Sequence, residues 1–211
     1  MRKGDGRWTG RWCAALLALV FVASFAPAAA AAQRLQFGVV YSIDASGGVV
    51  QVALTVDEVA AGPMRLQVHE NATAVRASID GQAMSVSLGE ADEFERAVTI
   101  DVPRAGGPML VEYELPSAPA RSDAFTRVNP AYVSFLAIVD SDLGNGSVRV
   151  ELPPGFVGGL DRSVFDLEAR TSSGEVWVRD AVGAAALFDL VVARNEAGLT
   201  RSTVDVDGRA I

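Results

Sequence analysis

Apolar and polar residues alternate with a period of two in several segments between Leu35 and Leu115. In the segment VVQVALTV one face holds the apolar residues Val50, Val52, Leu54 and Val56. This alternation is typical of antiparallel strands with one buried and one solvated face. Asp80-Gly81 lies between two such segments and is a strong signal for a two-residue hairpin. The first half of the chain therefore predicts antiparallel sheet.

The segment from Tyr132 to Val139 differs because both of its alternating faces are mostly apolar. Periodicity alone does not separate such a run from a buried helix. Pro130 precedes it, a turn-rich segment follows it, and β-branched and aromatic residues fill it. These features predict a strand that is covered on both sides and around which the other strands pack.

About thirteen short strands with frequent turn signals predict an all-β fold, either an antiparallel β-sandwich or a saddle-like sheet. The segment PSAPAR, 116–121, divides a first β-sheet region, 33–116, from a second, 117–211. Segments of this length are usually loops between sheets, so we expect one continuous β-domain. In the second region only 180–187 could form a helical turn.

Residues 1–32 have the pattern of a secretory signal peptide: a basic start, an apolar run from Cys13 to Phe25, and small residues around Ala30. The alternative is an uncleaved membrane anchor, which Pro27 and the alanine run disfavour. We therefore expect a secreted or extracytoplasmic protein with no membrane insertion after cleavage.

The remaining chain is acidic and lacks cysteine. Residues 1–32 carry a net charge of +3 out of a total of −8, which leaves −11 for the rest. Nucleic acids and anionic membranes are bound through clustered basic residues, so the charge excludes them as expected partners. Without disulfides the fold must rest on its hydrophobic core.

The sequence contains no complete catalytic set, and we expect no enzymatic activity and no cofactor or metal in this chain. The only histidine, His69, is followed by Glu70, but position 73 is Thr where a zinc-peptidase helix needs a second His. We expect His69 at the surface, at the end of a strand. The acidic run of Glu90, Asp92, Glu93 and Glu95 predicts a solvated hairpin rim better than a pair of catalytic carboxylates.

The segment from Asp140 to Glu151 partly matches a calcium-binding loop. Position six of that loop requires glycine and is Asn145 here, and no flanking helices are predicted. A hairpin loop rich in turn-forming residues explains the segment better.

Three phrases, RSDAFTRVNPAYVSF (121–135), SVRVELPPGFV (147–157) and LTRSTVDVDG (199–208), resemble the N-terminal β-domain of secreted bacterial metallopeptidase-like proteins of the gluzincin class, related to aminopeptidase N. The resemblance covers about 35–208. It implies that this domain packs against a zinc-bearing domain and helps to shape its substrate cleft. The zinc motif of that class lies beyond residue 211, so no catalytic or metal-binding residue transfers to this chain.

Asp207-Gly208 predicts a final hairpin whose return strand holds only Arg209 to Ile211, so we expect that the chain stops inside an element. We expect a non-catalytic exported β-sandwich module that supports a larger metallopeptidase-like protein. The alternative is a free-standing secreted ligand-binding or adhesion β-sandwich.

The candidate contacts to a C-terminal catalytic domain or another protein are Arg121, Arg127, Asn129, Tyr132 and Trp177. Arg and Asn beside a buried strand usually organise loop hydrogen bonds, and we favour this structural role for the first three. For Trp177, a place in the core is an equally good interpretation.

Overall fold

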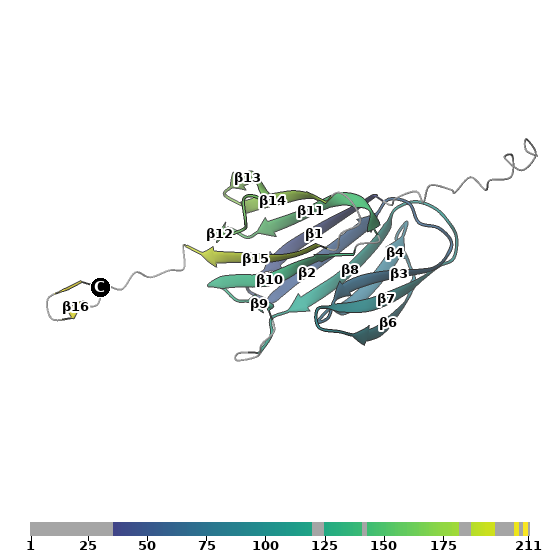
Figure 1. Ribbon diagram of the computed structural model, residues 1–211, viewed down its shortest axis with the longest axis horizontal. Coiled ribbons are helices and arrows are strands. Elements are labelled where there is room, and N and C mark those ends of the chain that lie inside the picture. Colours follow the sequence, from purple (N-terminus) through teal and green to yellow (C-terminus); the bar gives the residue numbers. More distant parts are fainter. Residues whose placement is uncertain are drawn as a thin grey trace, which may run out of the picture. The chain divides into compact units, whose positions relative to one another are not determined.

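A computed structural model describes residues 36–119, 125–140, 143–181, 187–196, 205–206 and 209–210. These residues belong to one compact unit, Arg34–Ile211. They form strands connected by turns, and no α-helix occurs in the part of the chain that is described (Figure 1). The prediction of an all-β fold is confirmed. No helix long and apolar enough to cross a membrane occurs among these residues.

The largest sheet has eight strands. In spatial order they are β13 (Asp166–Thr171), β14 (Gly174–Ala181), β11 (Asn145–Leu152), β1 (Gln36–Asp44), β2 (Val49–Val56), β8 (Met109–Pro116), β4 (Thr73–Ile79) and β5 (Gln82–Ala83). Strands β1 and β11 pair in parallel, and the other described pairs are antiparallel. The sheet contains strands from both sides of Pro116, so the two β-sheet regions of the sequence share it.

Two smaller sheets form the second layer, in front of the large sheet in Figure 1. The four-stranded sheet has the order β12 (Phe156–Gly158), β15 (Leu187–Asn195), β10 (Tyr132–Val139) and β9 (Arg127–Val128). The three-stranded sheet has the order β3 (Gly62–His69), β7 (Glu95–Val102) and β6 (Ser85–Ala91). Near the chain end, β16 (Asp205–Val206) pairs with β17 (Arg209–Ala210), which confirms the predicted final hairpin.

The layers meet through the inner faces of β1 and β10. The rings of Tyr41 and Phe135 lie 5.3 Å apart, and both residues are fully buried. The Tyr41 hydroxyl donates to the Ile138 carbonyl (2.8 Å) and accepts from the Ile138 N–H (2.9 Å). Strand β9 is only two residues long and pairs with β10 at Val133 and Ser134. The Tyr41 hydroxyl therefore provides hydrogen-bond partners for the Ile138 N–H and C=O, which β9 does not reach.

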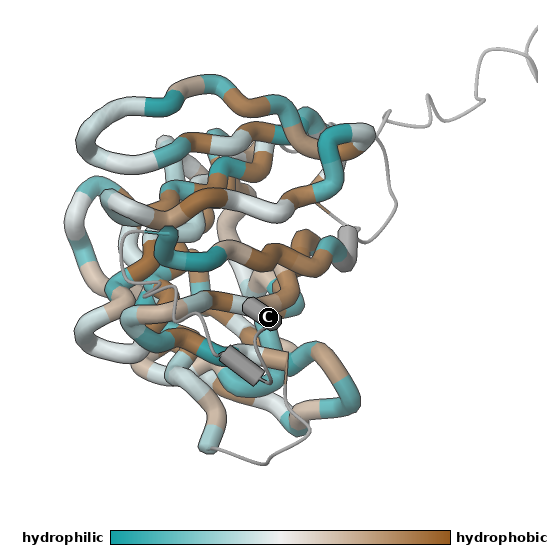
Figure 2. Tube along the Cα trace, turned by 90° about the vertical axis from the view of Figure 1, so that its left-hand side faces the viewer, coloured by the Kyte–Doolittle hydropathy of each residue, from teal (hydrophilic) through white to brown (hydrophobic). Residues whose placement is uncertain are grey.

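Apolar residues of the alternating pattern lie in the core, and the polar residues between them lie at the surface. In β2, the residues Val50, Val52, Leu54 and Val56 are all buried, as predicted. Figure 2 shows the same change between hydrophobic and hydrophilic positions along many strands. Asp80 and Gly81 have φ values of 50° and 74° between the paired residues Ile79 and Gln82, which confirms the two-residue hairpin.

Two connections differ from expectation or lie outside the described residues. The segment after β10 was expected to be a hairpin loop, but β10 and β11 belong to different sheets, so it is a crossover between layers. A hairpin is excluded because β11 pairs with β1 and β14. The proposed helical turn begins at Asp180 and Ala181, which end β14, and its residues 182–186 are not described.

Candidate interaction surface

Strand β10 has one fully buried face and one that is exposed at its start and becomes buried toward its end. On the inner face, Val133, Phe135, Ala137 and Val139 are buried. On the other face Tyr132 is 43% exposed, and Ser134 and Leu136 are half-buried. Ile138, on this same face, is buried. The prediction that the strand is covered on both sides therefore holds at Ile138 and is wrong toward Tyr132, because β10 lies in the outer layer of a two-layered fold and not in the large sheet.

The neighbouring strand β15 continues the open face with more apolar side chains. In the antiparallel register Leu190 pairs with Leu136, and Val192 pairs with Ser134. Paired residues point to the same side of a sheet. Leu190 is 52% exposed and Val192 is 40% exposed, whereas Val191 and Ala193 between and beside them are buried. The open face therefore extends across both strands.

Phe125 adds an aromatic ring beside this face. Its carbonyl accepts a hydrogen bond from the Ser134 hydroxyl (3.0 Å), which holds its backbone next to β10, and its side chain is 48% exposed. Its ring lies 6.0 Å from that of Phe94. We call the following set the outer apolar face: Phe125, Tyr132, Leu136, Leu190 and Val192.

Polar residues of β9 and its turn border the outer apolar face, and two of them were predicted contacts. Arg127 pairs with Ser134 across β9 and β10, and its guanidinium donates to the Thr126 carbonyl (3.1 Å). The Asn129 carboxamide oxygen accepts the N–H groups of Ala131 (2.8 Å) and Tyr132 (3.0 Å). Asn129 thus forms the turn that starts β10 and sets the position of Tyr132.

The other predicted contacts do not join this surface. Arg121 lies outside the described residues. The Trp177 side chain is 1% exposed, and its indole N–H donates to the buried Glu175 carboxylate (3.0 Å). Trp177 therefore takes the core alternative and is not accessible to a partner in this conformation.

Sequence reasoning missed Phe125, Leu190 and Val192. A signal for the last two was present, because the segment LFDLVVAR has apolar residues on both of its alternating faces, as β10 does. Two adjacent strands with this pattern indicate either a third layer or an exposed apolar face.

His69 is buried, with 2% of its surface exposed, so its expected place at the surface is wrong. It ends β3, where the preceding Val68 is also buried. The Asp140 carboxylate accepts the N–H of Gln67 (2.7 Å), so the end of β10 covers this part of β3. Burial lowers the pKa of His69 to about 4, and its Nδ1 accepts the N–H of Asn71 (3.2 Å).

The acidic run spans the end of β6, the turn that follows and the first residue of β7. Asp92 Oδ1 accepts the N–H groups of Phe94 (3.2 Å) and Glu95 (3.1 Å), and Glu90, Asp92 and Glu93 are exposed. Desolvation, together with the charges of Asp140 and Asp92, raises the pKa of Glu95. Across the described residues, no group of three or more His, Cys, Asp or Glu side chains has a geometry that could hold a metal ion.

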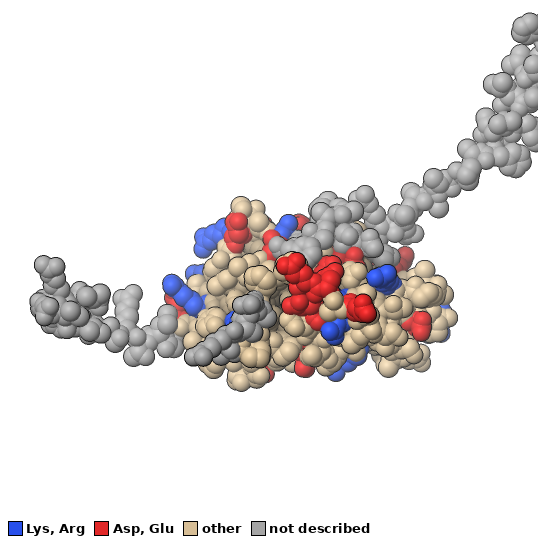
Figure 3. Space-filling model, turned by 60° about the horizontal axis from the view of Figure 1, so that its bottom comes forward, with Lys and Arg blue, Asp and Glu red and all other residues tan. Residues whose placement is uncertain are grey.

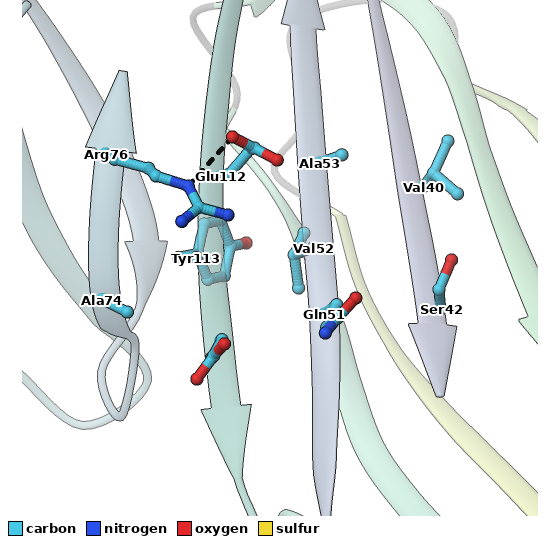
Figure 4. Close-up of a pocket in the computed structure, with 10 residues that line it drawn as sticks. Val40, Ser42, Gln51, Val52, Ala53, Ala74, Arg76, Glu112 and Tyr113 are labelled. Atoms are coloured by element: carbon cyan, nitrogen blue, oxygen red, sulfur yellow. Dashed lines mark hydrogen bonds and ion pairs between the residues drawn. The ribbon is translucent and has the colours of Figure 1, made fainter. Parts of the chain in front are cut away.

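A shallow hollow of about 140 Å³ lies on the outer face of the large sheet (Figure 4). Its side chains come from β1, β2, β4 and β8, and Figure 4 shows Arg76 reaching from β4 to Glu112 on β8. Their Nε to Oε2 distance is 3.0 Å, and the side chains are 71% and 39% exposed. Such an exposed pair adds little stability, and the exposed Glu114 is the other charged residue of the lining.

Comparison with known proteins finds no matching family model and no matching curated protein. Among solved structures, the M1 zinc metallopeptidase from Deinococcus radiodurans matches with a TM-score of 0.44 and 14% identity, over 76% of this chain and 42% of that chain. A single-residue mutant of that enzyme matches with a TM-score of 0.47 and 12% identity, over 77% and 42%. The mutant bound to a Tyr-Ser-Ala substrate matches with a TM-score of 0.45 and 10% identity, over 77% and 43%.

The chain thus spans less than half the length of the solved structures that it matches. These structures are M1 zinc metallopeptidases, the class that the sequence resemblance implied.

Proposed function

We propose that this chain is a non-catalytic β-sandwich module that supports a metallopeptidase-like domain and contacts it through the outer apolar face. The observation that carries the proposal is the pair of adjacent strands, β10 and β15, whose solvent side exposes Tyr132, Leu190 and Val192 where a two-layered sandwich usually presents polar residues. The class of the partner domain follows from the sequence resemblance. Metallopeptidase chemistry would then belong to the partner.

The composition of the outer apolar face fits a protein interface. Tyr132 and Phe125 offer aromatic side chains, and Arg127 and Arg194 lie at its border. Aromatic residues and arginine are enriched at interfaces, where a few of them provide most of the binding energy. Complete burial of one leucine stabilises an interface by about 1.5–3 kcal/mol. Contact with another domain removes this apolar area from water.

The test compares Leu190→Asp with Leu88→Asp. Leu190 is 52% exposed on β15, and Leu88 is 49% exposed on β6 of the other small sheet. The two substitutions therefore place the same charge at positions of similar exposure. The partner is the metallopeptidase-like domain that the coding DNA is expected to specify in frame after Ile211. Its affinity for each variant is measured by calorimetry.

We expect Leu190→Asp to weaken binding at least tenfold and Leu88→Asp to leave the affinity within twofold of wild type. Equal affinities of the two variants would show that the outer apolar face is not the contact. A stop codon directly after Ile211, with no peptidase-like domain encoded nearby, would contradict the supporting role itself.

A further inference from the structure

Arg96 projects from the inner face of β7 without a carboxylate partner. Its cross-strand neighbours are Val68 on β3 and Ala91 on β6, so neither adjacent strand offers a counter-charge. No ion pair joins Arg96 to any carboxylate in the described part of the chain. Its Nε is buried and has no hydrogen-bond partner.

Arg96 as a whole is half-buried, and the unmet need for an acceptor lies at its buried Nε–H. A buried N–H donor without an acceptor costs about 1–3 kcal/mol, and more when the group is charged. Arg96 thus presents a cationic donor whose buried Nε–H lacks an acceptor.

The Arg96 side chain lines an open cavity of about 460 Å³. The cavity lies where the end of β3, the start of β7 and the end of β8 come together, and its other lining residues come from the β3–β4 turn, 70–73, and from 116–119. This volume is in the range of small-molecule sites, about 300–1,000 Å³. The lining includes the polar residues Asn71, Thr73 and Ser117.

The charges around the cavity favour a singly charged anion. The one carboxylate in the lining, Glu70, accepts the amide of Asn71 (2.8 Å) and makes no ion pair with Arg96. Figure 3 shows acidic side chains gathered near the middle of one face of the molecule, whose formal net charge is −8. In a chain with a net charge of −8, a phosphate dianion meets more repulsion than a singly charged carboxylate does. A carboxylate also matches the planar donor geometry of a guanidinium.

We propose that this cavity binds a carboxylate-bearing ligand, held by the Arg96 guanidinium. The proposal goes beyond the supporting role, since the cavity and the outer apolar face share no residue. Either one can therefore fail without the other.

The test uses the full chain labelled with ¹⁵N, with the arginine Nε–Hε signals followed by NMR. Sodium acetate is added against sodium chloride at matched ionic strength. Arg96→Lys assigns the Arg96 signal, and the exposed Arg65 on β3 is the internal control. We expect a saturable shift of the Arg96 signal with a millimolar dissociation constant, no saturable shift of Arg65, and shifts of the Thr73 and Ser117 amides.

Arg96→Gln should weaken acetate binding at least tenfold. The amide shifts of Thr73 and Ser117 in the wild-type chain give a readout that does not depend on the stability of any variant. Equal, non-saturating shifts of Arg96 and Arg65 would mean a general ionic effect and would overturn the proposal.

A third arm distinguishes an external carboxylate from one within the chain. Asp123 follows the cavity-lining segment 116–119 closely in sequence and lies outside the described residues. If acetate binds only to the Asp123→Asn variant, the chain itself supplies the carboxylate, and the proposal of an external ligand is contradicted. If wild type binds acetate, the proposal holds.

Discussion

At the residue scale, buried polar side chains connect strands and make the stability of the fold depend on pH. Glu175 is 3% exposed, accepts the Gly158 N–H (3.0 Å) and the Trp177 indole, and pairs with Arg170 (2.6 Å). It thereby ties β12, β13 and β14 together. His69 is buried as the neutral form, and its burial links the stability of the fold to pH.

We predict that His69 destabilises the fold as the pH falls from 6.5 to about 4. Its pKa is lower in the folded than in the unfolded chain, so the unfolded chain binds more protons in this interval and stability rises with pH. The full difference between the two pKa values corresponds to about 3 kcal/mol in the free energy of unfolding. Glu95 acts in the opposite direction, because its raised pKa favours proton uptake by the folded chain.

The measurement is the free energy of unfolding in urea at several pH values, for wild type and for His69→Asn, which keeps an acceptor for the Asn71 N–H. The variant should lose less stability than wild type over this interval. Parallel curves for the two proteins would show that His69 does not titrate as described.

At the element scale, turns and the buried faces of strands were predictable from the sequence. The sheet to which each strand belongs was not. The Asp80-Gly81 turn and the buried face of β2 follow from backbone preference and from period-two alternation, which act within a few residues. The parallel pairing of β1 with β11 joins Phe37 to Gly146, far apart in sequence. No local pattern specifies such a pair. For the same reason, the two apolar faces of β10 indicated a central strand, although the structure places it in the outer layer.

Tyr41 supplies the test at this scale. Tyr41→Phe keeps the buried ring against Phe135 but leaves the N–H and C=O of Ile138 without their partner. We expect a loss of about 1–3 kcal/mol in the free energy of unfolding. Tyr132→Phe removes a hydroxyl from a side chain that is 43% exposed and should change stability by less than about 0.5 kcal/mol. Equal effects of the two substitutions would contradict the role given to Tyr41.

At the scale of the whole molecule, the two-layered sandwich leaves the outer apolar face of its smaller layer open. Of the five contacts predicted from the sequence, Arg127, Asn129 and Tyr132 lie together at this face. Trp177 could not be placed from its sequence, because alternation with Val176 and Val178 fits either side of a sheet. The fold class was predictable, whereas the exposed patch depends on which strands become neighbours.

The most direct measurement of the central claim is hydroxyl-radical footprinting of this chain alone and joined to the metallopeptidase-like domain. The account predicts that modification of Tyr132 and Leu190 falls several-fold in the joined protein, while Leu88, of similar exposure to Leu190, is modified equally in both. Undiminished modification of Tyr132 and Leu190 would contradict the claim that the outer apolar face contacts the partner domain.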